Sequence, residues 1–362
     1  MNRYWISKHW IIVSGAVAGV LAALATNWGN PPNMGICVAC MERDIAGALG
    51  FHRAAVVQYI RPEIIGFVIG ALIAALIFKE FKARSGSAPL IRFILGFLAM
   101  IGALVFLGCP WRALLRLAGG DGNALFGIAG LIAGIWIGIF FIKSGYDLGR
   151  NQRTYPLVGW IMPFIMFGLF LLLLFRPQLP SGAVFFSSEG PGSQHAPVFI
   201  AFIIALAIGF LAQRTRFCTV AAVRDTILIK DTYIMTGVAS LLIAAFLSNI
   251  VLNQFHFGFQ GQPIAHTNQW WNFGGMVLAG LAFTLAGGCP GRQLFLSGEG
   301  DADASLFVLG MIFGAGFAHN FATASSSTGP GIWGPASVIV GIIICLIIGF
   351  SRSDLLRKKK EI

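Results

Sequence analysis

Ten apolar runs, each close to the length of one bilayer crossing, dominate this sequence. A helix needs about 20 apolar residues to cross the hydrocarbon core, and it forms all its backbone hydrogen bonds internally, as lipid requires. Only 11% of the residues are charged, whereas a soluble domain carries about 25%. We therefore predict an all-α polytopic membrane protein with about ten transmembrane helices. The runs cover roughly residues 10–26, 63–79, 90–107, 124–143, 156–175, 197–213, 232–252, 271–286, 304–321 and 332–350.

Four shorter segments lie between these runs, and each contains a cysteine and an arginine. None is long enough to cross a membrane, so we expect short re-entrant or broken helices. Such backbone is tolerated at membrane depth only where protein or a cavity shields it from lipid. The four segments are residues 36–50, 109–117, 217–228 and 289–297.

The lysines predict the orientation of the chain. If the N-terminus is cytoplasmic, all eight lysines fall on the cytoplasmic side, in keeping with the bias of membrane proteins toward basic inner loops. They are Lys8, Lys79, Lys82, Lys143, Lys230 and Lys358 to Lys360. Ten spans then place the C-terminus in the cytoplasm too, and we expect a multi-pass protein of a bacterial inner membrane. Residues 10–26 lack a convincing small-residue cleavage site, so we interpret them as the first span and not as a removable signal.

The net charge of +11 does not indicate a nucleic-acid partner. The basic residues lie in short loops between apolar runs, where they orient helices. The tail at 354–362 is typical of an anchor at anionic lipid. Membrane lipid is therefore the expected partner of these charges.

A set of residues recurs in the same order in the two halves of the chain. The first cysteine and the second cysteine of the set are 72 positions apart in one half and 71 in the other. Several polar residue types recur with this spacing, which indicates an internal duplication. The first set is Cys37, Arg43, Asp44, GCPWR at 108–112 and Asp121; the second is Cys218, Arg224, Asp225, GCPGR at 288–292 and Asp301.

Each half contains five predicted spans, and an odd number places two successive halves in opposite orientations. We therefore expect an inverted repeat, in which the site lies near the midplane between the halves. The first repeat covers residues 1–176, a periplasmic connecting loop covers 177–196, and the second repeat covers 197–362 with its basic tail. The central path is then shaped like an hourglass, with matched motifs above and below the waist.

The GCPxR motif has a specific local meaning. Its glycine permits a tight bend, and its proline suits the first turn of a short helix. The cysteine then lies at a helix N-terminus, where free N–H groups and the helix dipole favour an anion or a thiolate. One copy alone is equally consistent with a kink, a packed cysteine and an arginine reaching the interface. Two copies favour a functional role.

Arginines inside a membrane are costly, at roughly 2.5–3.5 kcal/mol on insertion scales, so we expect them to face a cavity. Arginines combined with thiols favour an anion with a soft, polarizable atom such as sulfur or selenium. The predicted path residues are Cys37, Cys109, Cys218, Cys289, Arg43, Arg112, Arg224 and Arg292. Local ion pairs within Arg43–Asp44 and Arg224–Asp225 are the alternative for those arginines. The secondary candidates are Cys40, Asp44, Asp225 and His319.

Cys37 and Cys40 form a CxxC pair, which is compatible with a redox pair or half a metal site. The second half has Ala221 in place of Cys40, so the pair is not repeated. Cysteines divided between two membrane faces cannot close one zinc site. We expect no metal, no cofactor and no enzyme activity, and no nucleotide-binding motif is evident. Cys345 has no charged neighbour in its span and is interpreted as packing.

The stretches GICVACMERDIAGALG at 35–50 and RFCTVAAVRD at 216–225, with the two GCPxR motifs, resemble the YeeE/YedE family of transporters for sulfur-containing anions. The CVACMERD block after NPPNMG is most similar to the YedE branch, which is linked to selenium. The resemblance implies thiosulfate-type import, in which cysteines pass the anion along through S–H···S contacts. By motif match, that role falls on Cys37, Cys109 and Cys289, with Cys218 as the inverted partner of Cys37. It also implies a small cytoplasmic sulfur-carrier protein as a partner.

Two alternative functions are also consistent with the sequence. A transmembrane thiol–disulfide oxidoreductase would pass reducing equivalents through cysteine pairs, although the second half lacks a counterpart of the CxxC pair as a resolving thiol. An anion channel unrelated to sulfur would conduct without substrate selectivity. The sequence favours the importer of a sulfur or selenium anion.

Overall fold

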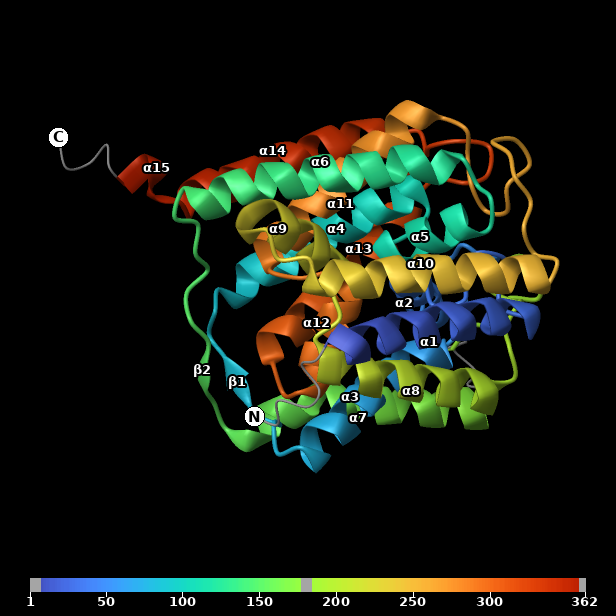
Figure 1. The fold of residues 1–362 in the computed structure, drawn as a ribbon, viewed down its shortest axis with the longest axis horizontal. Helices are drawn as coiled ribbons and strands as arrows, with labels where there is room; N and C mark the ends of the chain where they lie inside the picture. Colours follow the sequence, from blue (N-terminus) through green and yellow to red (C-terminus); the bar gives the residue numbers. More distant parts are fainter. Residues whose placement is uncertain (1–7, 177–183, 358–362) are drawn as a thin grey trace.

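The structure, a computed structural model, describes residues 8–176 and 184–357, and the described part is almost entirely helical (Figure 1). Ten of its helices coincide with the ten predicted runs, which confirms the all-α polytopic class. Nine described segments are long and apolar enough to cross a membrane, and α3 has 16 residues. The first half contains α1 (Lys8–Asn27), α3 (Pro62–Ile77), α4 (Pro89–Phe106), α6 (Asn123–Lys143) and α7 (Pro156–Phe175). The second half contains α8 (Val198–Thr215), α10 (Tyr233–Val251), α11 (Gln269–Ala286), α13 (Ala302–Asn320) and α14 (Gly334–Ser351).

The four short segments that contain cysteine and arginine are short helices. Each half has one after its first long helix and one after its third, so the order of long and short helices is the same in both halves. They are α2 (Val38–Ala48), α5 (Pro110–Ala118), α9 (Thr219–Ile229) and α12 (Pro290–Gly298). The remaining elements are β1 (Arg84–Ser85), which pairs antiparallel with β2 (Gln152–Arg153), and α15 (Asp354–Arg357).

The long helices of the two halves pack in exchanged pairs. Helix α1 packs on α10 and α3 on α8, while α4 packs on α13 and α6 on α11. Small residues let these backbones approach closely. A Cβ added at Gly96 would lie 2.1 Å from the carbonyl oxygen of Phe307, and one at Gly310 would lie 2.1 Å from that of Phe93. Glycine is therefore required on both sides of the α4–α13 contact.

Two extended segments exchange backbone hydrogen bonds with the opposite half. The N–H groups of Lys82 and Arg84 donate to the carbonyl oxygens of Glu299 and Gly300, at 2.9 and 3.1 Å. In the other direction, the N–H groups of His256 and Gly258 donate to the carbonyl oxygens of 119 and 120, at 2.9 and 3.0 Å. Each half thus supplies a short extended segment to the corner that follows a short helix of the other half.

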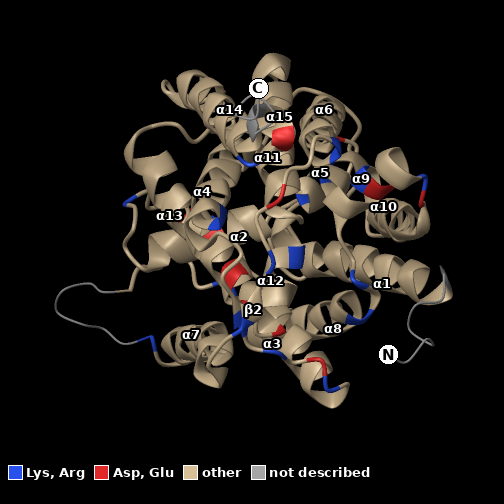
Figure 2. Cartoon of the chain, turned by 90° about the vertical axis from the view of Figure 1, so that its left-hand side faces the viewer, with Lys and Arg blue, Asp and Glu red and all other residues tan. Residues whose placement is uncertain are grey.

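The start of α1 and the helix α15 lie at the same end of the molecule, together with β1 and β2 (Figure 1). We name this end the terminal face and the opposite end the loop face. Figure 2 views the terminal face and shows charged residues at helix ends and near the centre, whereas the outer helix walls carry few charges. The 358–362 part of the basic tail expected at 354–362 and the 177–183 part of the connecting loop lie outside the described residues.

Candidate functional site

Each GCPxR motif breaks a long helix and starts a short one. Helix α4 ends at Leu107 with a left-handed φ of 65°, and α11 ends at Gly287 with a φ of 90°. After one more glycine, Cys109 or Cys289 takes extended backbone as the N-cap, and a proline begins the short helix. The two turns place both cysteines inside the protein at the N-termini of α5 and α12.

The first cysteine cluster consists of Cys37, Cys40 and Cys109, which are all buried. The thiol of Cys37 lies within hydrogen-bonding reach of the thiols of both other cysteines. Its Sγ also caps α2 by accepting from the N–H of Cys40 at 3.4 Å. Residues that are 72 positions apart in the sequence therefore form one group of thiols at a helix N-terminus.

Arg112 supplies the positive charge of this cluster. Its Nη1 donates to the Sγ of Cys40 at 3.3 Å and to the carbonyl oxygen of Leu107. Its Nη2 donates to the carbonyl oxygen of Ile264 at 3.2 Å. The guanidinium is buried and makes no ion pair among the described residues, so its charge is available to an anion.

The second cysteine cluster consists of Cys218 and Cys289, which are also buried. Their thiols lie within hydrogen-bonding reach of each other, and the Sγ of Cys218 accepts from the N–H of Cys289 at 3.3 Å. Each sulfur also caps its own helix, because the Sγ of Cys218 accepts from Ala221 and that of Cys289 accepts from Arg292, both at 3.4 Å. The two halves therefore build equivalent thiol pairs from equivalent residues.

A cavity of about 440 Å³ opens at the loop face above the first cluster. Arg43 and His319 supply its charged and titratable side chains, and residues 54, 56, 57 and 324–327 also line it. Leu107 and Ile264, the residues whose carbonyl oxygens hold Arg112, also line it. This cavity therefore ends beside the first cysteine cluster. We name it the outer cavity, and the cavity at the opposite face the inner cavity, after the orientation expected from the lysines.

Arg43 is paired within the protein and not free. Its Nη2 lies 2.6 Å from Oδ1 of Asp44, whose Oδ2 lies 2.7 Å from Nη2 of Arg61. Arg61 also donates to the carbonyl oxygens of Pro191 and Gln194, at 2.8 and 2.9 Å. One buried carboxylate thus joins two guanidinium groups and ties the loop before α8 to α2.

His319 lies beside this group. Its ring packs against that of His52, with centroids 4.4 Å apart and the rings tilted by 32°, and its Nε2 has no hydrogen-bond partner among the described residues. Nε2 of His52 bonds to the carbonyl oxygen of Arg43 at 3.0 Å. A histidine pair therefore borders the outer cavity where Arg43 enters it.

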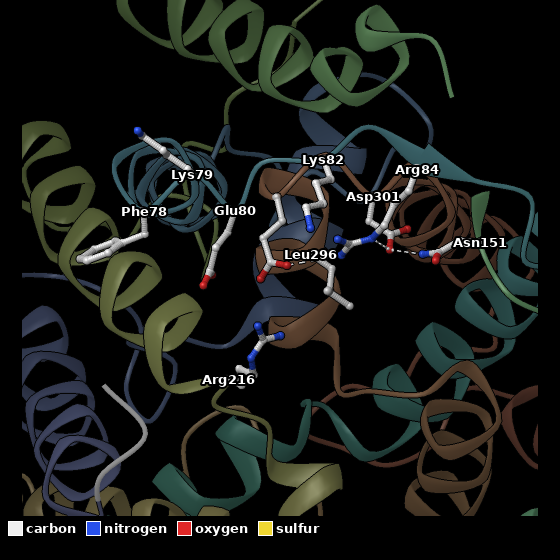
Figure 3. Close-up of a pocket in the computed structure, with 10 residues that line it drawn as sticks. Phe78, Lys79, Glu80, Lys82, Arg84, Asn151, Arg216, Leu296 and Asp301 are labelled. Atoms are coloured by element: carbon white, nitrogen blue, oxygen red, sulfur yellow. Dashed lines mark hydrogen bonds and ion pairs between the residues drawn. The ribbon is translucent and has the colours of Figure 1, made fainter. Parts of the chain in front are cut away.

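A second cavity, of about 690 Å³, opens at the terminal face. Figure 3 shows Lys82, Glu80 and Arg216 extending into it. Arg216 precedes Cys218 by two residues, and Leu296 of α12 lies on the cavity wall. The inner cavity therefore adjoins the segments that hold the second cysteine cluster.

A chain of ion pairs follows one wall of the inner cavity. Nη1 of Arg292 lies 3.2 Å from Oε1 of Glu299, whose Oε2 lies 3.3 Å from Nη2 of Arg84. Nε of Arg84 lies 2.7 Å from Oδ2 of Asp301, which also accepts from Asn151 at 3.1 Å (Figure 3). The arginine of the second GCPxR motif is thus neutralised, unlike Arg112.

Glu80 marks the opposite wall of this cavity. Partial burial raises the pKa of its carboxyl, but a hydrogen bond from Gln213 at 3.0 Å and the charge of Arg214 at 2.9 Å outweigh burial. The pKa of Glu80 therefore lies below its ordinary value. This pairing connects the end of α3 to the end of α8.

The structure thus places the predicted residues in two groups. Cys37, Cys40, Cys109 and Arg112 meet in the first cluster, and Cys218, Cys289 and Arg292 meet around the second. Asp44 and Asp225 form the local ion pairs that the sequence left open; Arg224 Nε lies 2.8 Å from Asp225, and its side chain is 25% exposed. Cys345 is buried in α14, apart from both clusters.

Three features of the site were not predicted from the sequence. Arg61 was not selected, although an arginine directly before an apolar run and a proline is an unusual residue to bury. The pairing of Cys218 with Cys289 was also missed, because only the fold brings them together; the second half does contain a thiol pair. Trp111 was missed as well, although the repeat has Gly291 at the matching position.

The comparisons with known proteins bear on the second half. Residues 214–344 match the model of a family described as sulphur transport. This segment contains Cys218, Arg224, Cys289 and Arg292. No curated protein matches the chain. The match supports a sulfur transporter, that is, a multi-pass membrane protein that handles a small anion.

Proposed function

We propose that this protein is an inner-membrane importer of a small sulfur-containing anion of the thiosulfate type, or of its selenium counterpart. The observation that carries the proposal is the pair of equivalent cysteine clusters. One adjoins a cavity at the loop face and the other adjoins a cavity at the terminal face. A path through a membrane needs an opening on each side and ligands between them.

The two halves support this path as an inverted repeat. Equivalent helices pack in exchanged pairs, and equivalent strands bond to the opposite half. Each half has five long helices, so a transmembrane arrangement places the halves in opposite orientations. We propose residues 1–176 and 197–362 as the two repeats, joined by the loop at 177–196.

The chemistry of the path suits an anion with a soft terminal sulfur or selenium. Neutral thiols donate weak S–H hydrogen bonds, and helix N-termini add N–H groups and positive partial charge. Arg112 attracts the anion into the first cluster from the outer cavity. Transit requires several weak sites in sequence and no single tight one, which a short series of thiols provides.

The direction of transport follows from the proposed orientation. Lys143 is the last residue of α6, and Lys79, Lys82 and Lys230 follow the ends of α3 and α9. These helix ends lie at the terminal face (Figure 1), and basic loops face the cytoplasm. The loop face is then periplasmic. The anion enters at Arg43 and Arg112 and leaves past Cys289, Cys218 and Arg292. A small cytoplasmic sulfur-carrier protein is the proposed acceptor at the inner cavity.

The test is uptake of labelled thiosulfate and of labelled selenite into proteoliposomes. The variants are Cys109→Ala and Cys289→Ala, and the matched control is Cys345→Ala, which removes a buried thiol outside both clusters. We expect uptake of one label by the intact protein and by the control, and loss of that uptake in both cluster variants. Equal uptake by all four proteins would show that the cysteine path is wrong.

A second candidate function is transmembrane thiol–disulfide exchange, which the thiol pair in each cluster favours. Exchange requires an attacking thiolate and a resolving thiol, and each cluster holds at least two thiols in mutual reach. Alkylation of free thiols before and during uptake separates the two functions. A disulfide that forms and disappears during turnover would favour exchange, and permanently reduced thiols would favour anion transport.

A further inference from the structure

Trp111 contacts residues that adjoin both cysteine clusters. Its side chain is 2% exposed, and its ring lies 5.8 to 6.0 Å from three phenylalanine rings. These are Phe67 of α3, Phe217 beside Cys218, and Phe295 of α12. Because Trp111 is the second residue after Cys109, one aromatic cluster joins the neighbours of both cysteine clusters.

The indole also rests on the N-terminus of the other GCPxR helix. A Cβ added at Gly291 would lie 2.8 Å from Cζ2 of Trp111 and 3.2 Å from Cε2, the carbon bonded to Nε1. Gly291 and Trp111 are the same position of the repeated motif. One copy therefore supplies a large ring, and the other supplies the empty space that the ring needs.

The indole N–H is unused in the described structure. Nε1 of Trp111 is buried and has no hydrogen-bond partner among the described residues. An indole can only donate, and leaving a buried donor unpaired destabilises the folded protein. A phenylalanine would fill the aromatic cluster without this cost. The N–H is therefore a candidate donor to a ligand.

We propose that Trp111 closes the path between the two cysteine clusters, and that its Nε1–H binds an oxygen of the anion as the anion passes from one cluster to the other. This inference rests on the proposed function and adds a specificity-determining residue to it. The N-termini of α5 and α12, each a helix of 9 residues, meet at this ring. The anion supplies the hydrogen-bond acceptor while the indole moves aside.

The barrier is tested by labelling, without any transport. In a background with Cys37, Cys40 and Cys109 replaced by alanine, the thiols left in the path are Cys218 and Cys289. A sulfonate-bearing methanethiosulfonate reagent is added at the loop face of oriented proteoliposomes, and labelled peptides are identified by mass spectrometry. We expect no labelling of either thiol with Trp111 present or with Trp111→Phe, and rapid labelling with Trp111→Gly. Equal labelling of all three proteins would overturn the barrier.

The hydrogen bond is tested by uptake. Trp111→Phe keeps an aromatic ring and removes the N–H, and the matched control Trp136→Phe removes an indole N–H from a side chain that is 65% exposed on α6. We expect uptake of the transported anion to fall about tenfold in Trp111→Phe, as for the loss of a hydrogen bond to a charged group, and to stay unchanged in the control. Unchanged uptake in Trp111→Phe would overturn the donor role.

The two measurements also separate this inference from the proposed function. If the intact protein takes up neither anion, the proposed function fails and the donor role fails with it. Labelling still decides the barrier in that case. A closed barrier in Trp111→Phe together with reduced uptake is the expected combination, and a purely structural role for the ring would not produce it.

Discussion

Replacing Asp44 by asparagine should strongly destabilise the protein. The carboxylate divides its two oxygens between two buried guanidinium groups, with Oδ1 at 2.6 Å from Arg43 and Oδ2 at 2.7 Å from Arg61. An asparagine is neutral and offers one oxygen and one NH₂ group, so both guanidinium groups would lose their counter-charge and one of them would also face a donor. Removing one partner of a buried ion pair costs about 3–5 kcal/mol, which lowers the melting temperature by several degrees.

The second half provides a matched control at the same motif position. Asp225→Asn removes the partner of Arg224, but the two side chains are 25% and 20% exposed, so we expect a loss of about 0–1 kcal/mol. All six cysteines are free and buried. A maleimide dye that fluoresces on reaction with newly exposed thiols therefore follows thermal unfolding of the detergent-solubilised protein. Equal melting temperatures for Asp44→Asn and Asp225→Asn would refute the reasoning. Adding Arg43→Gln to Asp44→Asn should restore only part of the loss, because Arg61 stays buried without its counter-charge.

Three further outcomes are expected. Arg112→Gln should lower anion uptake about tenfold, because a hydrogen bond to a charged group is lost; uptake within twofold of the intact protein would contradict a role for its charge. Gly291→Ala should reduce the free energy of unfolding by about 1–3 kcal/mol through overpacking, because the new Cβ would lie 2.8 Å from Trp111, and the melting temperature should fall. Adding Trp111→Phe, with its smaller ring, should recover stability. An unchanged melting temperature in Gly291→Ala would disprove the contact. Glu80→Gln should lower the stability of the protein, and the whole loss should be present above the ordinary carboxyl pKa of 4.5. The difference in stability between the variant and the intact protein should vanish as the pH falls through the lowered pKa of Glu80 in the folded state. A difference in melting temperature that stays constant from pH 8 to pH 3 would rule this out.

The helices could be predicted from the sequence because lipid leaves the backbone few choices. Apolar length identified all ten long helices, and the cysteine–arginine segments identified all four short ones. The partners of these helices could not be predicted. Nothing in the local sequence of α1 indicates that it packs on α10 and not on its neighbour α3, since both surfaces are equally apolar and only the three-dimensional exchange distinguishes them.

The candidate site was predictable as a list of residues but not as a set of contacts. Repeated spacing identified Cys37 and Cys109, yet their meeting depends on the bend at Leu107, where a leucine takes a left-handed conformation that composition does not indicate. The sequence allowed Arg43 either to pair with Asp44 or to face the path. The structure shows the ion pair, and Asp44 also pairs with Arg61, which lies outside the repeated motif. Trp111 is informative only when compared with Gly291 in the other half.

The exchanged strands have a consequence for how the chain is made. The carbonyl groups of Gly119 and Gly120 leave the ribosome long before His256 and Gly258, which bond to them. The segment around Lys82 waits longer still for its acceptors at 299 and 300. Until then, water or a chaperone must supply hydrogen-bond partners for these backbone groups, because the lipid hydrocarbon has none. The two sets of backbone hydrogen bonds should therefore form in order during biogenesis, with those to residues 119 and 120 forming before those to residues 299 and 300.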